Sequence, residues 1–171
     1  MKSVTTMEEL FLHNLKDIYH AEKQLLKALP KMAKAASSDD LRGAFEEHLQ
    51  ETEHQVERLE QVFQILDVAP RGIKCAAMEG LLEEGSEVID APMDAAVKDA
   101  ALIGAANKVE HYEIATYGTL CSYAKQLGYD EALELLVATL DEEKAADRKL
   151  TELAESDINL QVETEEVEAE E

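Results

Sequence analysis

Residues 101–127, ALIGAANKVEHYEIATYGTLCSYAKQL, decide the fold of this chain. Their apolar side chains recur every three or four positions, which is the spacing of an α-helix with one buried stripe, here called its seam. Two acids, Glu110 and Glu113, fall on that seam between Ala106 and Tyr117. Because a buried charge must be paired or bound to a metal, the stretch predicts a long packed helix that carries an acidic site.

Three other segments repeat this layout. Residues 7–36 have a seam interrupted by Glu22, and residues 130–154 have one interrupted by Glu143 and Asp147. Residues 41–66 are less regular, but their best seam includes His48. We therefore expect four long helices whose acids meet near the middle of a bundle.

The signals at the helix ends support these boundaries. Thr6 and Glu9 have capping-box spacing at the start of the first helix, and Gly128 suits a left-handed residue at the end of the third. Asp130 is expected to cap the fourth helix. Pro30 removes a backbone donor inside the first helix, so we expect a kink or a tightened last turn there.

The segment between the second and third long helices is long enough to cross the bundle. It contains a shorter helical stretch from Lys74 to Ile89. One long crossover between two helical hairpins matches the connectivity of ferritin-like bundles. The predicted fold class is all-α, a ferritin-like four-helix bundle with an additional short crossover helix between helices two and three. We place this bundle at residues 1–155 and expect residues 156–171 to be an acidic, disordered tail.

Composition narrows the partners. The chain has 171 residues and a net charge of −22 at pH 7, which argues against nucleic acid or an anionic membrane as a partner. No apolar run reaches membrane-spanning length, and the start, MKSVTTMEEL, lacks the apolar core of a signal peptide. We therefore expect a cytoplasmic protein. The two cysteines, Cys75 and Cys121, are too far apart in sequence to indicate a disulfide framework or a cysteine zinc site.

The acids on the seams predict a dinuclear metal site, because no lysine or arginine balances them on the same stripes. Oxygen-rich ligation with some imidazole suits iron or manganese, so we expect two divalent ions of one of these metals. The candidate ligands come from all four long helices: Glu22, His48, Glu51, Glu110, Glu113, Glu143 and Asp147.

The nitrogen ligand has two candidates on the second helix. Glu51 and His54 have the Glu-x-x-His spacing of di-iron carboxylate bundles, which favours His54. The apolar periodicity instead favours His48, with Glu51 on the flank of the seam. We prefer His48 with Glu51.

Several stretches resemble the YciF-like family of ferritin-like bacterial stress proteins, among them HLQETEHQVERLEQVF and the more specific VEHYEIATYGTL. The resemblance covers nearly the whole chain to about residue 155. It implies a bundle with an extra crossover helix, a homodimer, a rubrerythrin-type di-metal centre and a link to general stress responses. In the wider di-iron pattern, the histidine expected three residues after Glu143 is replaced by Ala146, and Asp147 follows.

The leading functional hypothesis is a dinuclear iron or manganese protein of the stress response that acts on peroxide, oxygen or ferrous iron. The alternative is a metal-free, acidic helical bundle that acts as an interaction protein. Replacing a seam acid by leucine separates the two, because only the metal hypothesis predicts loss of metal-dependent stability.

Overall fold

The protein is all-helical in the residues that the computed structural model describes, 4–162. In chain order the elements are α1 (Met7–Ala35), α2 (Asp39–Ile65), α3 (Ala76–Asp90), α4 (Ala95–Leu127), α5 (Asp130–Leu153) and a π-helical segment, η1 (Ala154–Ile158).

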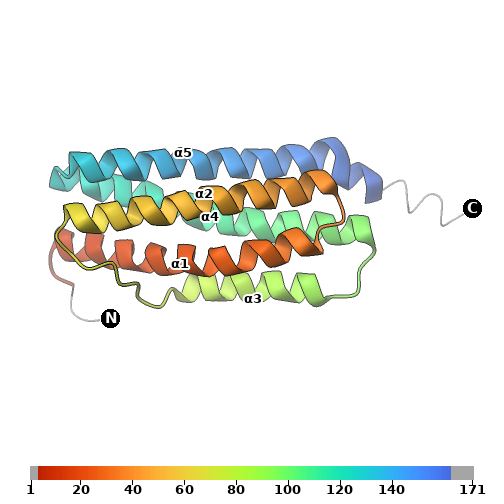
Figure 1. The fold of residues 1–171 in the computed structure, drawn as a ribbon, viewed down its shortest axis with the longest axis horizontal. Coiled ribbons are helices and arrows are strands. Elements are labelled where there is room, and N and C mark those ends of the chain that lie inside the picture. Colours follow the sequence, from red (N-terminus) through yellow and green to blue (C-terminus); the bar gives the residue numbers. More distant parts are fainter. Residues whose placement is uncertain (1–3, 163–171) are drawn as a thin grey trace, which may run out of the picture.

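The four long helices form a bundle with α3 on its outside (Figure 1). α1 and α2 are an antiparallel hairpin, and so are α4 and α5. The connection through α3 runs back along the bundle, so α2 and α4 point the same way. α1 packs on α2 and α4, α5 packs on the same two helices, and α3 packs on α1 and α4. The predicted fold class and its crossover helix are confirmed.

Local side-chain contacts fix where the first hairpin begins and turns. The Thr6 hydroxyl accepts from the Glu9 backbone N–H at 3.2 Å, and the Glu9 carboxylate accepts from the Thr6 N–H at 3.3 Å, which completes the predicted capping box. Between α1 and α2, the buried Asp99 carboxylate of α4 accepts from the backbone N–H groups of Ser37 and Ser38 at 2.9 and 2.7 Å. The turn is thereby held against the second hairpin.

Two details near the other helix ends concern sequence expectations. Gly128 adopts the expected left-handed conformation, with φ of 71°. The expectation that Asp130 caps α5 is wrong, because Tyr129 is the N-cap residue and Asp130 already lies in the first helical turn. There its negative charge favours the positive end of the helix dipole without a capping hydrogen bond. α1 continues through Pro30 to Ala35.

The helical backbone extends past the predicted end of the bundle at residue 155. η1 adds one residue to the turn after α5, and Ile158 is buried against the core. Residues 159–162 are also helical. The first part of the expected tail is therefore packed, because the side chain of Ile158 reaches the core. The remaining part of the expected tail, residues 163–171, lies outside the described residues.

Within the described part of the chain, the helices fall short of the combination of length and apolar composition that crossing a bilayer requires. Their buried faces pack on one another, and the apolar core runs along the bundle axis.

Candidate metal centre

Four side chains from three helices converge inside the bundle. Glu110 and Glu113 come from α4, Glu143 from α5 and His48 from α2, and all four are buried. One ligand atom from each lies within 4.8 Å of the others. This cluster, called the carboxylate cluster below, brings together the residues that interrupt the predicted seams.

His48 connects the interior of the cluster with its rim. Its Nε2 lies 3.2 Å from Glu110 Oε1 and 3.8 Å from Glu143 Oε2. Its Nδ1 lies 3.3 Å from Glu51 Oε2. If Nδ1 carries the proton and donates to Glu51, Nε2 offers its lone pair to the interior, which is how metal-binding histidines are oriented.

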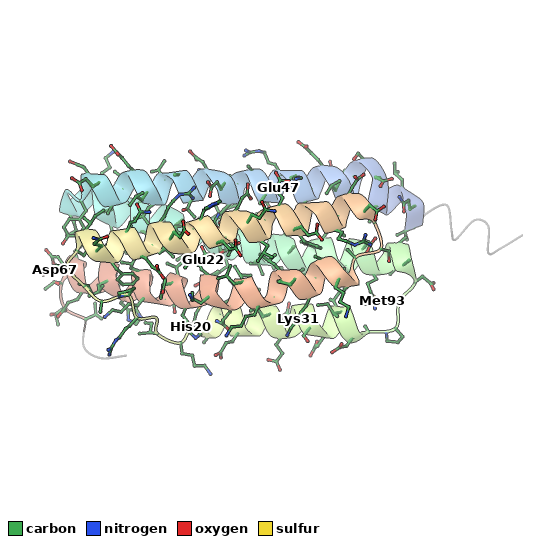
Figure 2. The ribbon with its side chains drawn as sticks, in the orientation of Figure 1. His20, Glu22, Lys31, Glu47, Asp67 and Met93 are labelled. Carbon is green, nitrogen blue, oxygen red and sulfur yellow. The ribbon has the colours of Figure 1, made fainter. Side chains whose placement is uncertain are left out.

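Glu22 of α1 is fully buried and belongs to the same electrostatic group. Its Oε1 accepts a hydrogen bond from the hydroxyl of Tyr117, a fully buried residue of α4. Its Oε2 has no hydrogen-bond partner. Figure 2 labels Glu22 near the middle of the bundle's length, away from both ends of the helices. The carboxylate cluster and Glu22 thus place four carboxylates and one imidazole in the core.

These side chains leave polar atoms without partners, which is rare in protein interiors. Among the described residues, every buried side-chain oxygen or nitrogen of this kind belongs to the group, apart from Gln55 Oε1. Both oxygens of Glu113 and both of Glu143 are included. His48 Nε2 is included as well, because its approach to Glu110 lacks hydrogen-bond geometry. Such atoms are well suited to ligate a cation.

The charges in this buried site disfavour one another. Burial raises the pKa of Glu113 well above its usual range, and the neighbouring carboxylates Glu143, Glu22 and Glu110 raise it further. Burial also raises the pKa of Glu143 well above its usual range, although His48 opposes the change. Burial raises the pKa of Glu22 to about 7, against the hydrogen bond from Tyr117. The carboxyl groups therefore hold protons at pH values where exposed glutamates are ionised.

His48 responds in the opposite sense. Burial alone lowers its pKa, but the charge and proximity of Glu110, with Glu51 and Glu143, raise the pKa well above its usual value. The single basic side chain within the cluster is thus held by acids on several sides. A divalent cation would compete with this proton for the same carboxylates.

An ion pair on one flank of the group was missed by the sequence analysis. The Arg58 guanidinium donates to both Glu142 oxygens at 2.6 Å, and Gln55 Nε2 donates to Glu142 at 3.2 Å. Burial opposes ionisation of Glu142, but these donors hold its pKa below the usual value. Gln55 is a buried residue of α2, whereas nothing in the spacing distinguishes Glu142 from the exposed acid Asp141 beside it.

Glu51 and Asp147 lie outside the carboxylate cluster. Glu51 is half-buried at the rim, where it contacts His48. Asp147 Oδ1 accepts from Asn107 Nδ2 at 2.8 Å and lies 3.2 Å from the Nε2 of the exposed His111. Its partners therefore hold Asp147 away from the cluster. Of the two histidine candidates, His48 is buried in the cluster and His54 is exposed, as the periodicity predicted.

Comparison with known proteins places the chain in a family. The model of a domain of unknown function, DUF892, matches residues 6–163. Protein YciF of Escherichia coli (strain K12) is 52% identical over 162 residues, which cover 94% of this chain and 98% of that protein. The chain belongs to the YciF-like family. The resemblance seen in the sequence is thereby confirmed.

Solved structures of similar proteins have the same fold. The crystal structure of the Escherichia coli stress protein YciF matches with a TM-score of 0.88 at 53% identity, over 91% of this chain and 99% of that chain. YcfI from Rhodopseudomonas palustris matches with a TM-score of 0.86 at 48% identity, over 88% and 96%. A protein from Xanthomonas campestris pv. campestris, 23% identical with a TM-score of 0.72 over 94% and 99%, shares the fold. The family thus includes a stress protein.

Proposed function

We propose that the carboxylate cluster and Glu22 bind two divalent ions of iron or manganese, and that the loaded protein acts on peroxide, oxygen or ferrous iron during stress. The observation that carries the proposal is the concentration of buried, unpartnered ligand atoms on Glu22, His48, Glu110, Glu113 and Glu143. Nothing in the described core pairs these oxygens with lysine or arginine. A cation of sufficient charge would satisfy them all.

Charge and donor type both support two metal ions. Glu22, Glu110, Glu113 and Glu143 contribute four negative charges when ionised, and two divalent cations balance that number. Carboxylate oxygens with one imidazole suit iron or manganese, whereas structural zinc and copper sites favour more nitrogen or sulfur. A redox-active metal pair would supply electrons to an oxidant such as peroxide or oxygen, or accept electrons from a reductant such as ferrous iron.

The protein's own residues would hold this site in three ways. Glu51 orients the His48 ring through Nδ1, which leaves Nε2 directed inward. The Tyr117 hydroxyl fixes one oxygen of Glu22 and leaves the other unpartnered. On the flank of the group, the positive charge of Arg58 is already neutralised by Glu142, so Arg58 leaves the buried carboxylates available to a metal.

Metal analysis of the full chain tests the proposal. The protein is purified after growth with added iron and manganese, and metal per chain is measured together with peroxide consumption and ferrous oxidation. We expect about two metal ions per chain, and Glu143→Gln is expected to lower this number while the exposed-site variant Glu134→Gln leaves it unchanged. A protein without stoichiometric metal would overturn the proposal and leave the metal-free interaction protein as the explanation.

The family resemblance also predicts a homodimer. We propose this assembly for the chain, and light scattering of the purified full-length protein measures its mass directly. A monomeric mass across the accessible concentration range would reject it.

A further inference from the structure

A cavity of about 120 Å³ lies beside the carboxylate cluster, between α1, α2, α4 and α5. Its walls are mainly apolar and include Leu25, Leu29, Met32, Phe45, Val109 and Leu150. It also touches His48 and Glu110. The cavity is therefore an apolar space that reaches one edge of the proposed metal site.

Small side chains create this space. Four alanines line the cavity, Ala44 from α2, Ala106 from α4, and Ala145 and Ala146 from α5. Ala146 lies one turn after Glu143, where the wider di-iron pattern has a histidine. A methyl group at that position leaves open space beside the cluster that an imidazole would occupy.

The charges around the cavity restrict what can enter it. Three of its polar lining residues are acids, Glu47, Glu51 and Glu110. Its one lysine, Lys149, is paired with Glu47 of α2, and Figure 2 labels Glu47 on the side of the bundle where α5 lies. Both members of this pair are about half exposed, which places them at the opening. The lining also includes His48, whose two ring nitrogens face Glu51 and Glu110, so the three acids outnumber the two basic side chains. This excess of negative charge disfavours an anion and does not repel a neutral molecule.

We propose that this cavity binds one small, uncharged, largely hydrocarbon molecule of about the size of benzene, against the His48–Glu110 edge of the cluster. An apolar cavity of about 150 Å³ can bind benzene, and the apolar part of this lining, in a cavity of similar size, suits such a ligand. The inference that the bound molecule is a substrate rests on the proposed metal function. The inference that the cavity binds such a molecule rests on the cavity alone.

Toluene titration of the full chain tests the binding site. Methyl resonances of Leu25, Leu29 and Val109 are followed by NMR in the protein as purified and after chelator treatment, with metal content measured on both samples. We expect saturable shifts of these methyl groups in both samples. Benzoate, an anion of similar size, is expected to bind at least about tenfold more weakly than toluene.

Leucine variants of alanines on α5 locate the binding. Ala146→Leu fills the cavity and is expected to weaken toluene binding by at least about tenfold. Ala138→Leu is the matched control, because it adds the same atoms at an exposed position of α5 and should leave binding unchanged. Ala145→Leu, at a more exposed cavity position, replaces Ala146→Leu if circular dichroism shows that the latter is unfolded.

Three results would overturn the inference: no saturable toluene binding to the wild type, equal binding by a folded cavity-filling variant, or benzoate binding as tightly as toluene. The toluene measurement needs no metal, so the two proposals can fail separately. If the purified protein carries no metal but still binds toluene saturably, the proposed function is rejected and the cavity assignment stands. Stoichiometric metal without toluene binding would do the reverse.

Discussion

Glu113→Leu should change the stability of the protein in opposite directions without and with metal. Glu113 is fully buried, both of its oxygens lack partners, and its pKa is raised well above the usual range by burial and by Glu143, Glu22 and Glu110. Leucine has a similar volume and removes one carboxyl group from this crowded site. In the metal-free protein the substitution should therefore be stabilising.

The expected magnitudes are large enough to measure. Leaving a buried polar group without a partner costs about 1–3 kcal/mol, and an apolar side chain of similar volume removes that cost. A gain of about 2 kcal/mol corresponds to a rise in Tm of about 4–8 °C for a domain of this size. Conversely, a metal at about one hundred times its Kd stabilises the wild type by about 2.7 kcal/mol, and the variant should lose most of that increment.

Thermal unfolding followed by circular dichroism measures both effects. Wild type and Glu113→Leu are compared after chelation and again with a graded excess of manganese, which avoids the air oxidation of ferrous iron. Glu134→Leu is the control, because Glu134 is exposed on α5 and its loss should change neither the metal-free Tm nor the response to manganese.

Two results would refute this reasoning. A lower Tm of metal-free Glu113→Leu would show that the buried carboxyl stabilises the core without a cation. A manganese response of the same size in wild type and variant would show that Glu113 does not contribute to metal binding.

Three further predictions concern Glu22, Tyr117 and Asp147. The pKa of Glu22 is about 7 in the folded protein and 4.5 in the unfolded reference, so its contribution to stability is complete below pH 4.5 and is lost as pH rises through 7. Between pH 4.5 and 8 the free energy of unfolding of the metal-free wild type should therefore fall by about 3 kcal/mol relative to Glu22→Gln, as measured by urea unfolding. Tyr117→Phe removes the hydrogen-bond donor to Glu22 and should lower the free energy of unfolding of the metal-free protein by about 1–3 kcal/mol in the same assay. With manganese bound the loss should be smaller, because the metal replaces the missing partner of Glu22. Asp147→Asn should keep the metal content of the wild type and change stability by less than about 0.5 kcal/mol, because Asp147 bonds Asn107 away from the cluster; loss of metal in this variant would return Asp147 to the ligand set.

Much of the fold followed from local patterns. The three- and four-residue spacing of apolar side chains, the capping box at Thr6 and the left-handed Gly128 depend on a few neighbouring residues, so sequence alone located the long helices. Asp130 was misassigned, and the packed turn around Ile158 was missed. The start of α5 and the turn around Ile158 depend on how the chain reverses direction and packs against other helices, and local sequence patterns do not contain that information.

The acidic site was visible in the sequence only as interruptions of the apolar seams. Those interruptions identified Glu22, Glu110, Glu113 and Glu143, because a polar residue on the packed face of a helix is directed toward the core. The same argument also selected Asp147, which instead bonds Asn107 outside the cluster. The same argument selected His48 over His54.

The sequence by itself therefore determined the helices and the seam acids, since each is set by periodicity along one segment. It also determined the single crossover, because the segment between the second and third long helices is long enough to cross the bundle. Only the tertiary structure decided which acids meet. It brought Glu143 into the cluster, held Asp147 on Asn107, and placed the Arg58–Glu142 pair on the flank, because these contacts depend on the rotation and register of one helix against another. The cavity beside His48 has the same origin, because four alanines leave a space only once their helices face one another.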